Sequence, residues 1–244
     1  MTAKGAMKTE VLADSEAVAE RAASLIAGHA REAIAARGSF VMAVSGGHTP
    51  WIMLRRLAAA ADIPWAAVHV VQVDERVAPA GHTDRNLTHI LESLVSNSPL
   101  RAEQVYAMPV ESADLDAAAA SYAATLRTIA GEPARIDLVH LGLGPDGHTA
   151  SLVPGDPVLD VDDSDVALTG PYQGRRRMTL TYPILNRARR ILWVVTGAEK
   201  AGMIHRLLDG DRSIPAGRVN RDEAVVLADS AAAGQSTNGG VVCA

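Results

Sequence analysis

Short apolar segments alternate with longer amphipathic segments along most of this chain of 244 residues. The apolar segments predict strands over residues 9–13, 40–44, 68–73, 105–108, 136–141, 190–195 and 224–227. The amphipathic segments predict helices over residues 15–37, 49–60, 86–95, 113–130 and 198–208. Strands that are apolar on both faces and alternate with helices are typical of a mostly parallel sheet covered by helices on both faces. The alternation therefore predicts the α/β class.

We expect a single Rossmann-like domain over residues 9–233, because no domain boundary interrupts the alternation. Residues 1–8 predict a flexible N-terminus, and residues 234–244, rich in Gly, Ser and Asn, predict a disordered tail. Residues 155–177 contain several glycines and prolines and five aspartates. That composition predicts a surface excursion rather than a helix.

The composition excludes several classes of partner. Proteins that bind a phosphate backbone usually carry a basic excess, but the formal net charge here is -5, so nucleic acid is not an expected partner. The single cysteine, Cys243, excludes a disulfide or a cysteine-based zinc site within one chain, and it fits a reducing compartment. No secretory h-region and no run of about 18 uncharged apolar residues occurs. We therefore expect a cytoplasmic monomer that does not associate with membranes.

The first motif is Ser-Gly-Gly-His-Thr-Pro at residues 45–50, between a predicted strand and a predicted helix. Gly46 and Gly47 let the backbone approach an anion closely, and the hydroxyls of Ser45 and Thr49 can donate hydrogen bonds to it. The motif lacks the Lys of a nucleotide P-loop, so a sugar phosphate fits better than a nucleoside triphosphate. The alternative interpretation is a tight turn without a ligand.

Two further motifs place charge after strands. Asp74-Glu75-Arg76 ends an apolar strand, so its three charged side chains require solvent or a ligand. In one interpretation, Arg76 pairs with a phosphate. In the other, the three residues form a surface ion-pair cluster. Lys200 follows Gly197 at the start of a predicted helix and can add a cation to the same edge, although a lysine there is also ordinary surface.

Residues 141–152 form the most specific motif, Leu-Gly-Leu-Gly-Pro-Asp-Gly-His-Thr-Ala-Ser-Leu. His148 follows a buried strand among glycines that clear space for a ligand. An imidazole can accept a proton from water near neutral pH, and Asp146 can hold its tautomer. These features favour a general base over a structural histidine.

The same segment also contains a G-x-G-x-x-G pattern, which suggests a dinucleotide site. We reject that interpretation because Pro154 interrupts the helix that should follow and Asp146 would set a negative charge where pyrophosphate must lie. His82 and His89 make no recognisable metal motif, and the G-x-S-x-G elbow of serine hydrolases is missing.

The motifs together resemble the 6-phosphogluconolactonase family over about residues 10–230. The matching segments are Ser-Gly-Gly-x-Thr-Pro at 45–50, Asp-Glu-Arg at 74–76 with Asn86 downstream, Leu-Gly-x-Gly-x-Asp-Gly-His-x-Ala-Ser-Leu at 141–152, and 197–200. The chain differs from the family's common forms at three positions: His48 and Arg85, where Ser is usual, and Val153, where Phe is usual. These differences concern substrate contacts rather than the predicted base.

The resemblance implies hydrolysis of 6-phosphoglucono-δ-lactone to 6-phosphogluconate in the oxidative pentose phosphate route, without a metal or organic cofactor. It implies that the 45–49 loop, Arg76 and Lys200 hold the phosphate and that His148 acts on the lactone carbonyl. The remaining substrate contacts that we expect are Asp74, Asn86, Gly144, Gly147 and Arg177. Backbone N–H groups of the loop from Gly144 to Gly147 are expected to stabilise the oxyanion, and the sequence does not assign the individual donors.

Two rival functions remain. Glucosamine-6-phosphate deaminases share the phosphate loop and the Asp-Gly-His segment, but their histidine is typically followed by Ile-Ala-Phe-Asn-Glu-Pro. Here Thr149 to Gly155 reads Thr-Ala-Ser-Leu-Val-Pro-Gly, which points to the lactonase branch. The other rival is a sugar-phosphate sensor that binds its ligand without turnover.

Overall fold

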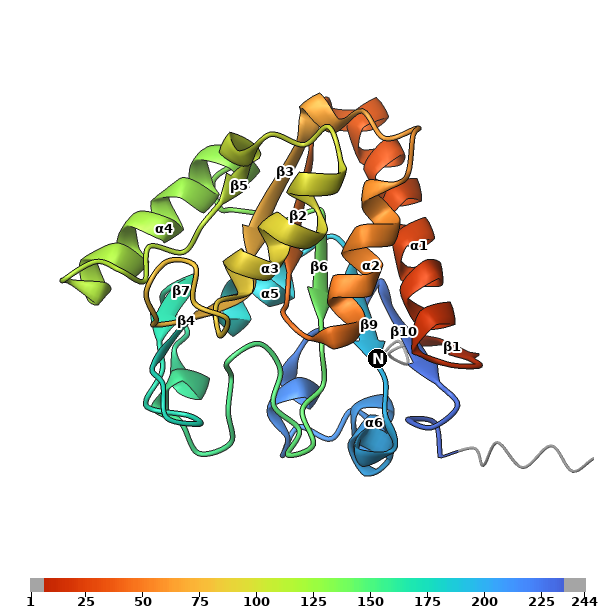
Figure 1. Ribbon diagram of the computed structural model, residues 1–244. Coiled ribbons are helices and arrows are strands. Elements are labelled where there is room, and N and C mark those ends of the chain that lie inside the picture. The colour runs from red at the N-terminus through yellow and green to blue at the C-terminus, as the bar shows by residue number, and fades with distance from the viewer. Residues whose placement is uncertain (1–6, 235–244) are drawn as a thin grey trace, which may run out of the picture.

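A seven-stranded parallel sheet forms the centre of the computed structural model, which describes residues 7–234 (Figure 1). Its strands, in spatial order, are β1 (Lys8–Leu12), β10 (Ala224–Asp229), β9 (Ile191–Val195), β6 (Leu138–Leu141), β2 (Phe40–Val44), β3 (Val68–Gln72) and β5 (Val105–Tyr106). Every neighbouring pair is parallel. The predicted α/β class with a mostly parallel sheet is confirmed.

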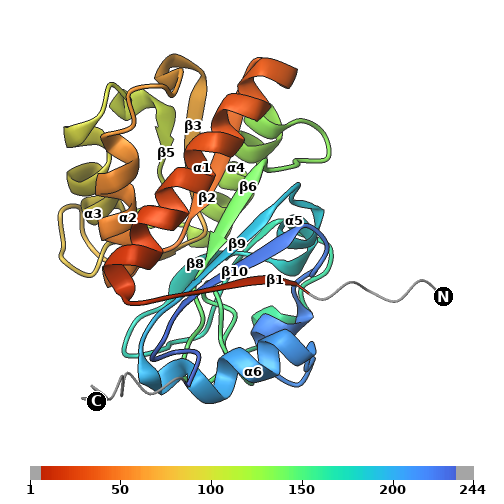
Figure 2. The same cartoon turned by 90° about the vertical axis from the view of Figure 1, so that its right-hand side faces the viewer.

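Helices cover both faces of this sheet. They are α1 (Ser15–Arg37), α2 (His48–Ala58), α3 (Asn86–Ser93), α4 (Leu115–Ala130), α5 (Tyr182–Arg187) and α6 (Ala201–Asp209). Short 3-10 turns are η1 (Trp65–Ala67), η2 (Val95–Asn97), η3 (Ala102–Gln104), η4 (Pro157–Asp160), η5 (Ala198–Lys200) and η6 (Pro215–Arg218). One core lies between the sheet and α1, α2 and α3, and a second lies between the sheet and α4, α5 and α6. Figure 2 shows α1 in front of the sheet and α4 behind it.

Strand β2 shows why the sheet needs two helical layers. All five of its residues are buried. Phe40, Met42 and Val44 belong to the core beneath α1 and α2, whereas Val41 and Ala43 belong to the opposite core. Because successive side chains of a strand point to opposite faces, an apolar run of this kind requires cover on both sides.

A second, antiparallel sheet was not predicted. It contains β4 (Asp74–Arg76), β8 (Arg177–Leu180) and β7 (Val166–Leu168) in that order, and it lies beside the lower end of the large sheet in Figure 1. The chain passes from one sheet to the other at Val73, whose N–H donates to the Val44 carbonyl and whose carbonyl accepts from Leu180. The second sheet places the end of β3 next to residues a hundred positions later.

The prediction of a surface excursion over residues 155–177 was therefore partly wrong. The segment contains η4 and β7, and Val158 and Val166 are buried in the core. Apolar residues spaced between the aspartates fold inward, while most of the aspartates stay at the surface. No α-helix occurs in this part of the described chain, as the glycines and prolines predicted.

The expected termini lie mostly outside the described residues, which exclude 1–6 and 235–244. Within the expected flexible N-terminus, Met7 is buried and Lys8 begins β1, where it pairs with Val225. The first strand therefore starts one residue earlier than predicted. At the other end, the described chain closes in a turn at 230–234.

Candidate active site

A cavity of about 160 Å³ lies at the carboxyl edge of the large sheet, where β2, β3, β6 and β9 end. Ligands of open α/β sheets bind at this edge. The lining residues are Ser45, Gly46, Asp74, Arg76, Asn86, Gly142, Leu143, Gly144, His148, Ala150, Arg177 and Lys200. Most of the predicted site residues therefore surround one space, although they come from segments far apart in the sequence.

Four predicted residues do not line the cavity. Asp146 lies behind His148 as its hydrogen-bond partner. Gly47 precedes α2 with a φ of 133°, and the hydroxyl of Thr49 shares a 2.8 Å hydrogen bond with Thr196. Gly147 adopts a φ of 83°, and a Cβ there would lie 2.7 Å from Ile214 Cβ. These residues support the site without facing it.

His148 and Asp146 form a close pair. Nδ1 of His148 lies 2.6 Å from Oδ1 of Asp146, and the backbone N–H of His148 donates to the same oxygen at 3.1 Å. Because a carboxylate only accepts, Nδ1 carries a proton, and in the neutral imidazole Nε2 is the nitrogen with the lone pair. Partial burial raises the pKa of Asp146, but the hydrogen bonds and the nearby charge of His148 outweigh that effect and hold this pKa below its usual value. Asp146 therefore stays ionised and fixes the tautomer.

The glycine loop makes room for this pair. A Cβ at Gly144 would overlap the imidazole of His148 and lie 2.7 Å from Oδ1 of Asp146. The N–H of Gly144 donates to the His148 carbonyl, and the N–H of Gly147 donates to the Gly144 carbonyl. These two N–H groups are therefore engaged within the loop in this structure, and the expectation that N–H groups of the loop from Gly144 to Gly147 stabilise an oxyanion stays a prediction.

The turn at Ser45 is fixed to β6. Its N–H donates to Nδ1 of His140 at 3.2 Å, and its hydroxyl donates to the His140 carbonyl at 2.9 Å. Burial lowers the pKa of His140 to about 4, so this imidazole is neutral and can accept the hydrogen bond. The hydroxyl of Ser45 is thus engaged with β6 in this structure, and its predicted hydrogen bond to an anion stays a prediction. Ser45 nevertheless lines the cavity.

Polar contacts run along one wall of the cavity. Nη1 of Arg76 donates to Asn86 Oδ1 at 2.9 Å, and the amide of Asn86 donates to Asp74 at the carbonyl and at Oδ1. Oδ2 of Asp74 accepts from Ser151 Oγ at 2.6 Å and lies 3.9 Å from Nη1 of Arg177. Asp74 therefore holds Asn86 and Ser151 in place, because it accepts hydrogen bonds from both side chains.

Three cations reach this cavity. The Nε atoms of Arg76 and Arg177 are buried without a hydrogen-bond partner, and Lys200 Nζ lies 3.7 Å from the exposed Glu199. Burial lowers the pKa of Arg177, although a guanidinium stays charged at neutral pH. With Asp74 as the one acidic lining residue, the lining carries a net positive charge in a chain that is negative overall. That polarity suits an anionic ligand.

Glu75 is not at the surface, so both interpretations of the Asp-Glu-Arg motif were wrong for this residue. It is completely buried and lies 3.1 Å from Nε of the buried Arg85. It accepts hydrogen bonds from Gln72 Nε2 and from the N–H groups of Arg76, Asn86 and Leu87. Glu75 thus caps the start of α3 and fixes two lining residues, and Arg85 serves as its counter-ion.

Sequence reasoning missed three residues that contact the site: His140, Ser151 and Tyr172. His140 looked like an ordinary strand residue, and Ser151 was part of a motif without an assigned role. Tyr172 belongs to the segment that was expected to be a surface excursion, and its phenol donates to Asp146 Oδ2 at 3.2 Å. No local pattern signals that contact.

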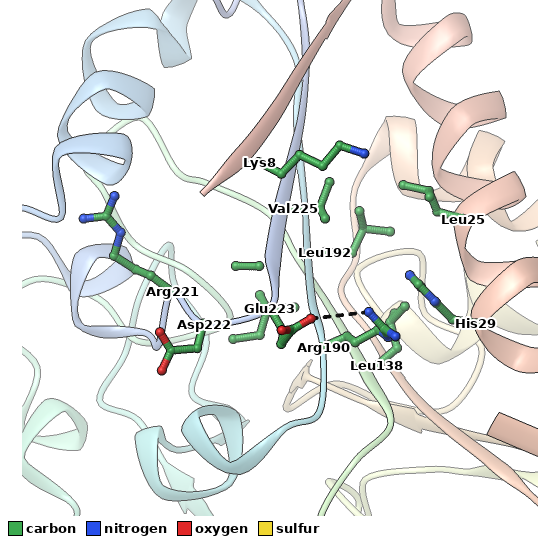
Figure 3. Close-up of a pocket in the computed structure, with 12 residues that line it drawn as sticks. Lys8, Leu25, His29, Leu138, Arg190, Leu192, Arg221, Asp222, Glu223 and Val225 are labelled. Carbon is green, nitrogen blue, oxygen red and sulfur yellow. Dashed lines mark ion pairs between the residues drawn. The ribbon is translucent and has the colours of Figure 1, made fainter. Parts of the chain in front are cut away.

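A larger cavity lies elsewhere, at the amino ends of β1, β6, β9 and β10. It measures about 620 Å³ and is lined by apolar residues such as Leu25 and Val225 together with charged ones (Figure 3). Arg190 and Glu223 pair there at 3.6 Å. None of the predicted site residues lines this cavity. The smaller cavity with His148 and the three cations is therefore the candidate active site.

Within residues 7–234, no group of three or more His, Cys, Asp or Glu side chains is arranged to hold a metal ion. Among the helices of the same region, none is long and apolar enough to cross a membrane.

Comparison with known proteins supports the resemblance. The family model for glucosamine-6-phosphate isomerases and 6-phosphogluconolactonase matches residues 13–227. The 6-phosphogluconolactonase of Synechocystis is 36% identical over 199 residues, covering 80% of this chain and 82% of the relative. That of Mycobacterium tuberculosis is 35% identical over 243 residues, covering 92% and 96%. The crystal structure of 6-phosphogluconolactonase from Thermotoga maritima superposes with a TM-score of 0.81 at 26% identity, covering 91% and 98%. This chain therefore belongs to the glucosamine-6-phosphate isomerase and 6-phosphogluconolactonase family.

Proposed function

We propose that the protein hydrolyses 6-phosphoglucono-δ-lactone to 6-phosphogluconate in the oxidative pentose phosphate route. One observation carries the proposal: His148, held by Asp146, lines the same cavity as three cations. Its relatives in Synechocystis and Mycobacterium tuberculosis are named 6-phosphogluconolactonases. A base and an anion-binding wall in one space suit a phosphorylated substrate with an electrophilic carbonyl.

The contacts of the wall divide the cavity into two ends. A Cβ at Gly46 would overlap Asn86, which accepts from Arg76, so these three residues share one end. Gly144 adjoins His148 at the other end. The phosphate lies at the first end, with Ser45, Gly46, Arg76 and Lys200, and the lactone carbonyl lies beside His148.

The reaction at the second end needs one base. Nε2 of His148 takes a proton from a water molecule while that water attacks the lactone carbonyl, and the imidazolium is stabilised by Asp146. The tetrahedral intermediate collapses when the bond to the ring oxygen breaks, and the imidazolium returns the proton to that oxygen. Arg177 is the proposed oxyanion donor, because its buried Nε has no other hydrogen-bond partner.

The test is to measure acid release by the purified protein from freshly prepared 6-phosphogluconolactone. We expect a rate well above spontaneous hydrolysis, and a much smaller kcat/KM for unphosphorylated gluconolactone, because that substrate cannot use the cationic end. Glucosamine 6-phosphate serves as a second substrate, and we expect no ammonia from it. A rate equal to that of buffer would contradict the proposal. Ammonia release would favour the deaminase, and binding without turnover would favour a sensor.

The proposed enzyme acts as a monomer in the cytoplasm. The single cysteine fits a reducing compartment. Light scattering coupled to gel filtration should give a mass near that of one chain.

Replacement of Gly144 by Ala should lower kcat about 100-fold, because the new Cβ would push the imidazole out of its contact with Asp146. The matched control is Gly202→Ala on α6, where a Cβ meets nothing within 4 Å. Unchanged folding by circular dichroism would separate misplacement of His148 from unfolding. Equal activity of the two variants would contradict the role of Gly144.

A further inference from the structure

Tyr172 lies at the tip of a hairpin that extends β7 and β8. The N–H of Thr169 donates to the Arg177 carbonyl, and Tyr172 and Arg175 exchange two backbone hydrogen bonds. The two residues between them, Gln173 and Gly174, have φ values of 51° and 79°. Positive φ at both central residues is the geometry of tight two-residue hairpin turns. The tip is therefore a defined structure that carries Tyr172 to the cavity.

The side chain of Tyr172 contacts three site residues at once. Its hydroxyl donates to Oδ2 of Asp146 at 3.2 Å. Its ring meets the imidazole of His148 edge-on, with centroids 5.4 Å apart and an interplanar angle of 66°. The guanidinium carbon of Arg177 lies 5.0 Å from the ring centroid. Edge-on aromatic pairs and cations over a ring face are both favourable arrangements.

The two oxygens of the Asp146 carboxylate accept hydrogen bonds from different residues. Oδ1 accepts both hydrogen bonds from His148, and Oδ2 accepts the one from Tyr172. A carboxylate held at both oxygens cannot rotate freely, so the direction of the imidazole is fixed as well. Arg177 is held in the same way, since Gln173 of the hairpin tip accepts from its Nη2 at 3.3 Å.

We propose that Tyr172 is a positioning residue for the lactonase reaction, which orients the Asp146–His148 pair through its hydroxyl and Arg177 through its ring. The proposal rests on the proposed function of the site. Partial burial, and then the negative charge of Asp146, raise the pKa of the Tyr172 phenol, so it remains a hydrogen-bond donor at neutral pH.

Two variants separate the two contacts. Tyr172→Phe keeps the ring and removes only the hydroxyl, so kcat should fall about 10-fold while KM changes less than about twofold. The carboxylate, released from the phenol, interacts more strongly with the imidazolium. The acid limb of the pH–rate profile should therefore move to higher pH. Tyr172→Leu removes the ring too, so its kcat should fall further than that of Tyr172→Phe.

Tyr106→Phe is the matched control. The hydroxyl of Tyr106 lies 3.0 Å from Nδ1 of His69, and their rings are 5.8 Å apart, between β3 and β5 and outside the cavity. This variant also loses a phenol beside an imidazole, but its kcat and pH profile should match those of the wild type. A Tyr172→Phe profile that superposes on the Tyr106→Phe profile would overturn the proposal.

A second readout does not depend on turnover. The His148 ring resonance can be followed by NMR from pH 5 to 8 and assigned by its loss in His148→Asn. Its titration midpoint should move to higher pH in Tyr172→Phe and stay in place in Tyr106→Phe. If the midpoint moves in Tyr172→Phe but the wild-type protein fails to hydrolyse the lactone, the proposed function is refuted and the coupling between Tyr172 and His148 is not. An unshifted midpoint would refute the positioning role.

Discussion

Replacement of His148 by Asn should lower kcat for 6-phosphogluconolactone by about 10² to 10⁴, the usual contribution of a general base. The amide of Asn can still donate to Asp146, whose carboxylate lies 2.6 Å from Nδ1 of the native imidazole. The variant therefore keeps the local hydrogen bond but lacks a group that takes a proton near neutral pH. KM should change little, because the cations that hold the phosphate are untouched.

The pH dependence distinguishes loss of a base from general damage. Residual activity of His148→Asn should lack the acid limb of the wild-type profile, because no imidazole remains to be protonated. His205→Asn is the control, since His205 lies exposed on α6 and outside the cavity. If His148→Asn retained more than a tenth of the wild-type kcat, another group would have to be the base.

Replacement of Glu75 by Ala should lower the free energy of unfolding by about 3–5 kcal/mol, as expected when one partner of a buried ion pair is removed. Arg85, whose side chain is 3% exposed, would be left without its counter-ion. The N–H groups of Arg76, Asn86 and Leu87 would lose their acceptor. Urea denaturation followed by circular dichroism measures the change.

The control for this prediction is a surface ion pair. Arg31 lies 2.7 Å from Asp62, but the two side chains are 45% and 65% exposed, so Arg31→Ala should cost less than about 1 kcal/mol. The loss of unfolding free energy in Glu75→Gln should lie between those of Glu75→Ala and Arg31→Ala, because an amide oxygen can accept some of the same hydrogen bonds. A Glu75→Ala protein as stable as Arg31→Ala would mean that the buried cluster does not stabilise α3.

Part of the site follows from the sequence because it depends on neighbours along the chain. Ser45 comes directly after one apolar strand and His148 lies in the loop that follows another, and strands of a parallel sheet end at a common edge. That rule alone is enough to predict that segments a hundred residues apart meet at one cavity. It requires no knowledge of individual side-chain contacts.

The rest depends on contacts that no local pattern reveals. Glu75 looks like part of a charged surface cluster until the structure shows Arg85 buried beside it. Tyr172 lies in a segment rich in glycine, proline and aspartate, and only the hairpin of β7 and β8 brings its hydroxyl to Asp146. The sequence predicts that the Ser45 hydroxyl donates to an anion, but it does not reveal that in this structure the acceptor is a carbonyl of the neighbouring strand. Burial and pairing across strands decide all three cases.

A crystal structure with 6-phosphogluconate bound would test the central claim most directly, namely that the imidazole and the cationic wall act on one ligand. We predict the phosphate against Arg76 and Lys200 near Gly46, and the C1 carboxylate within about 3.5 Å of Nε2 of His148. A ligand bound with its carboxylate away from His148, or seated in the large cavity at the amino ends of the strands, would contradict the account.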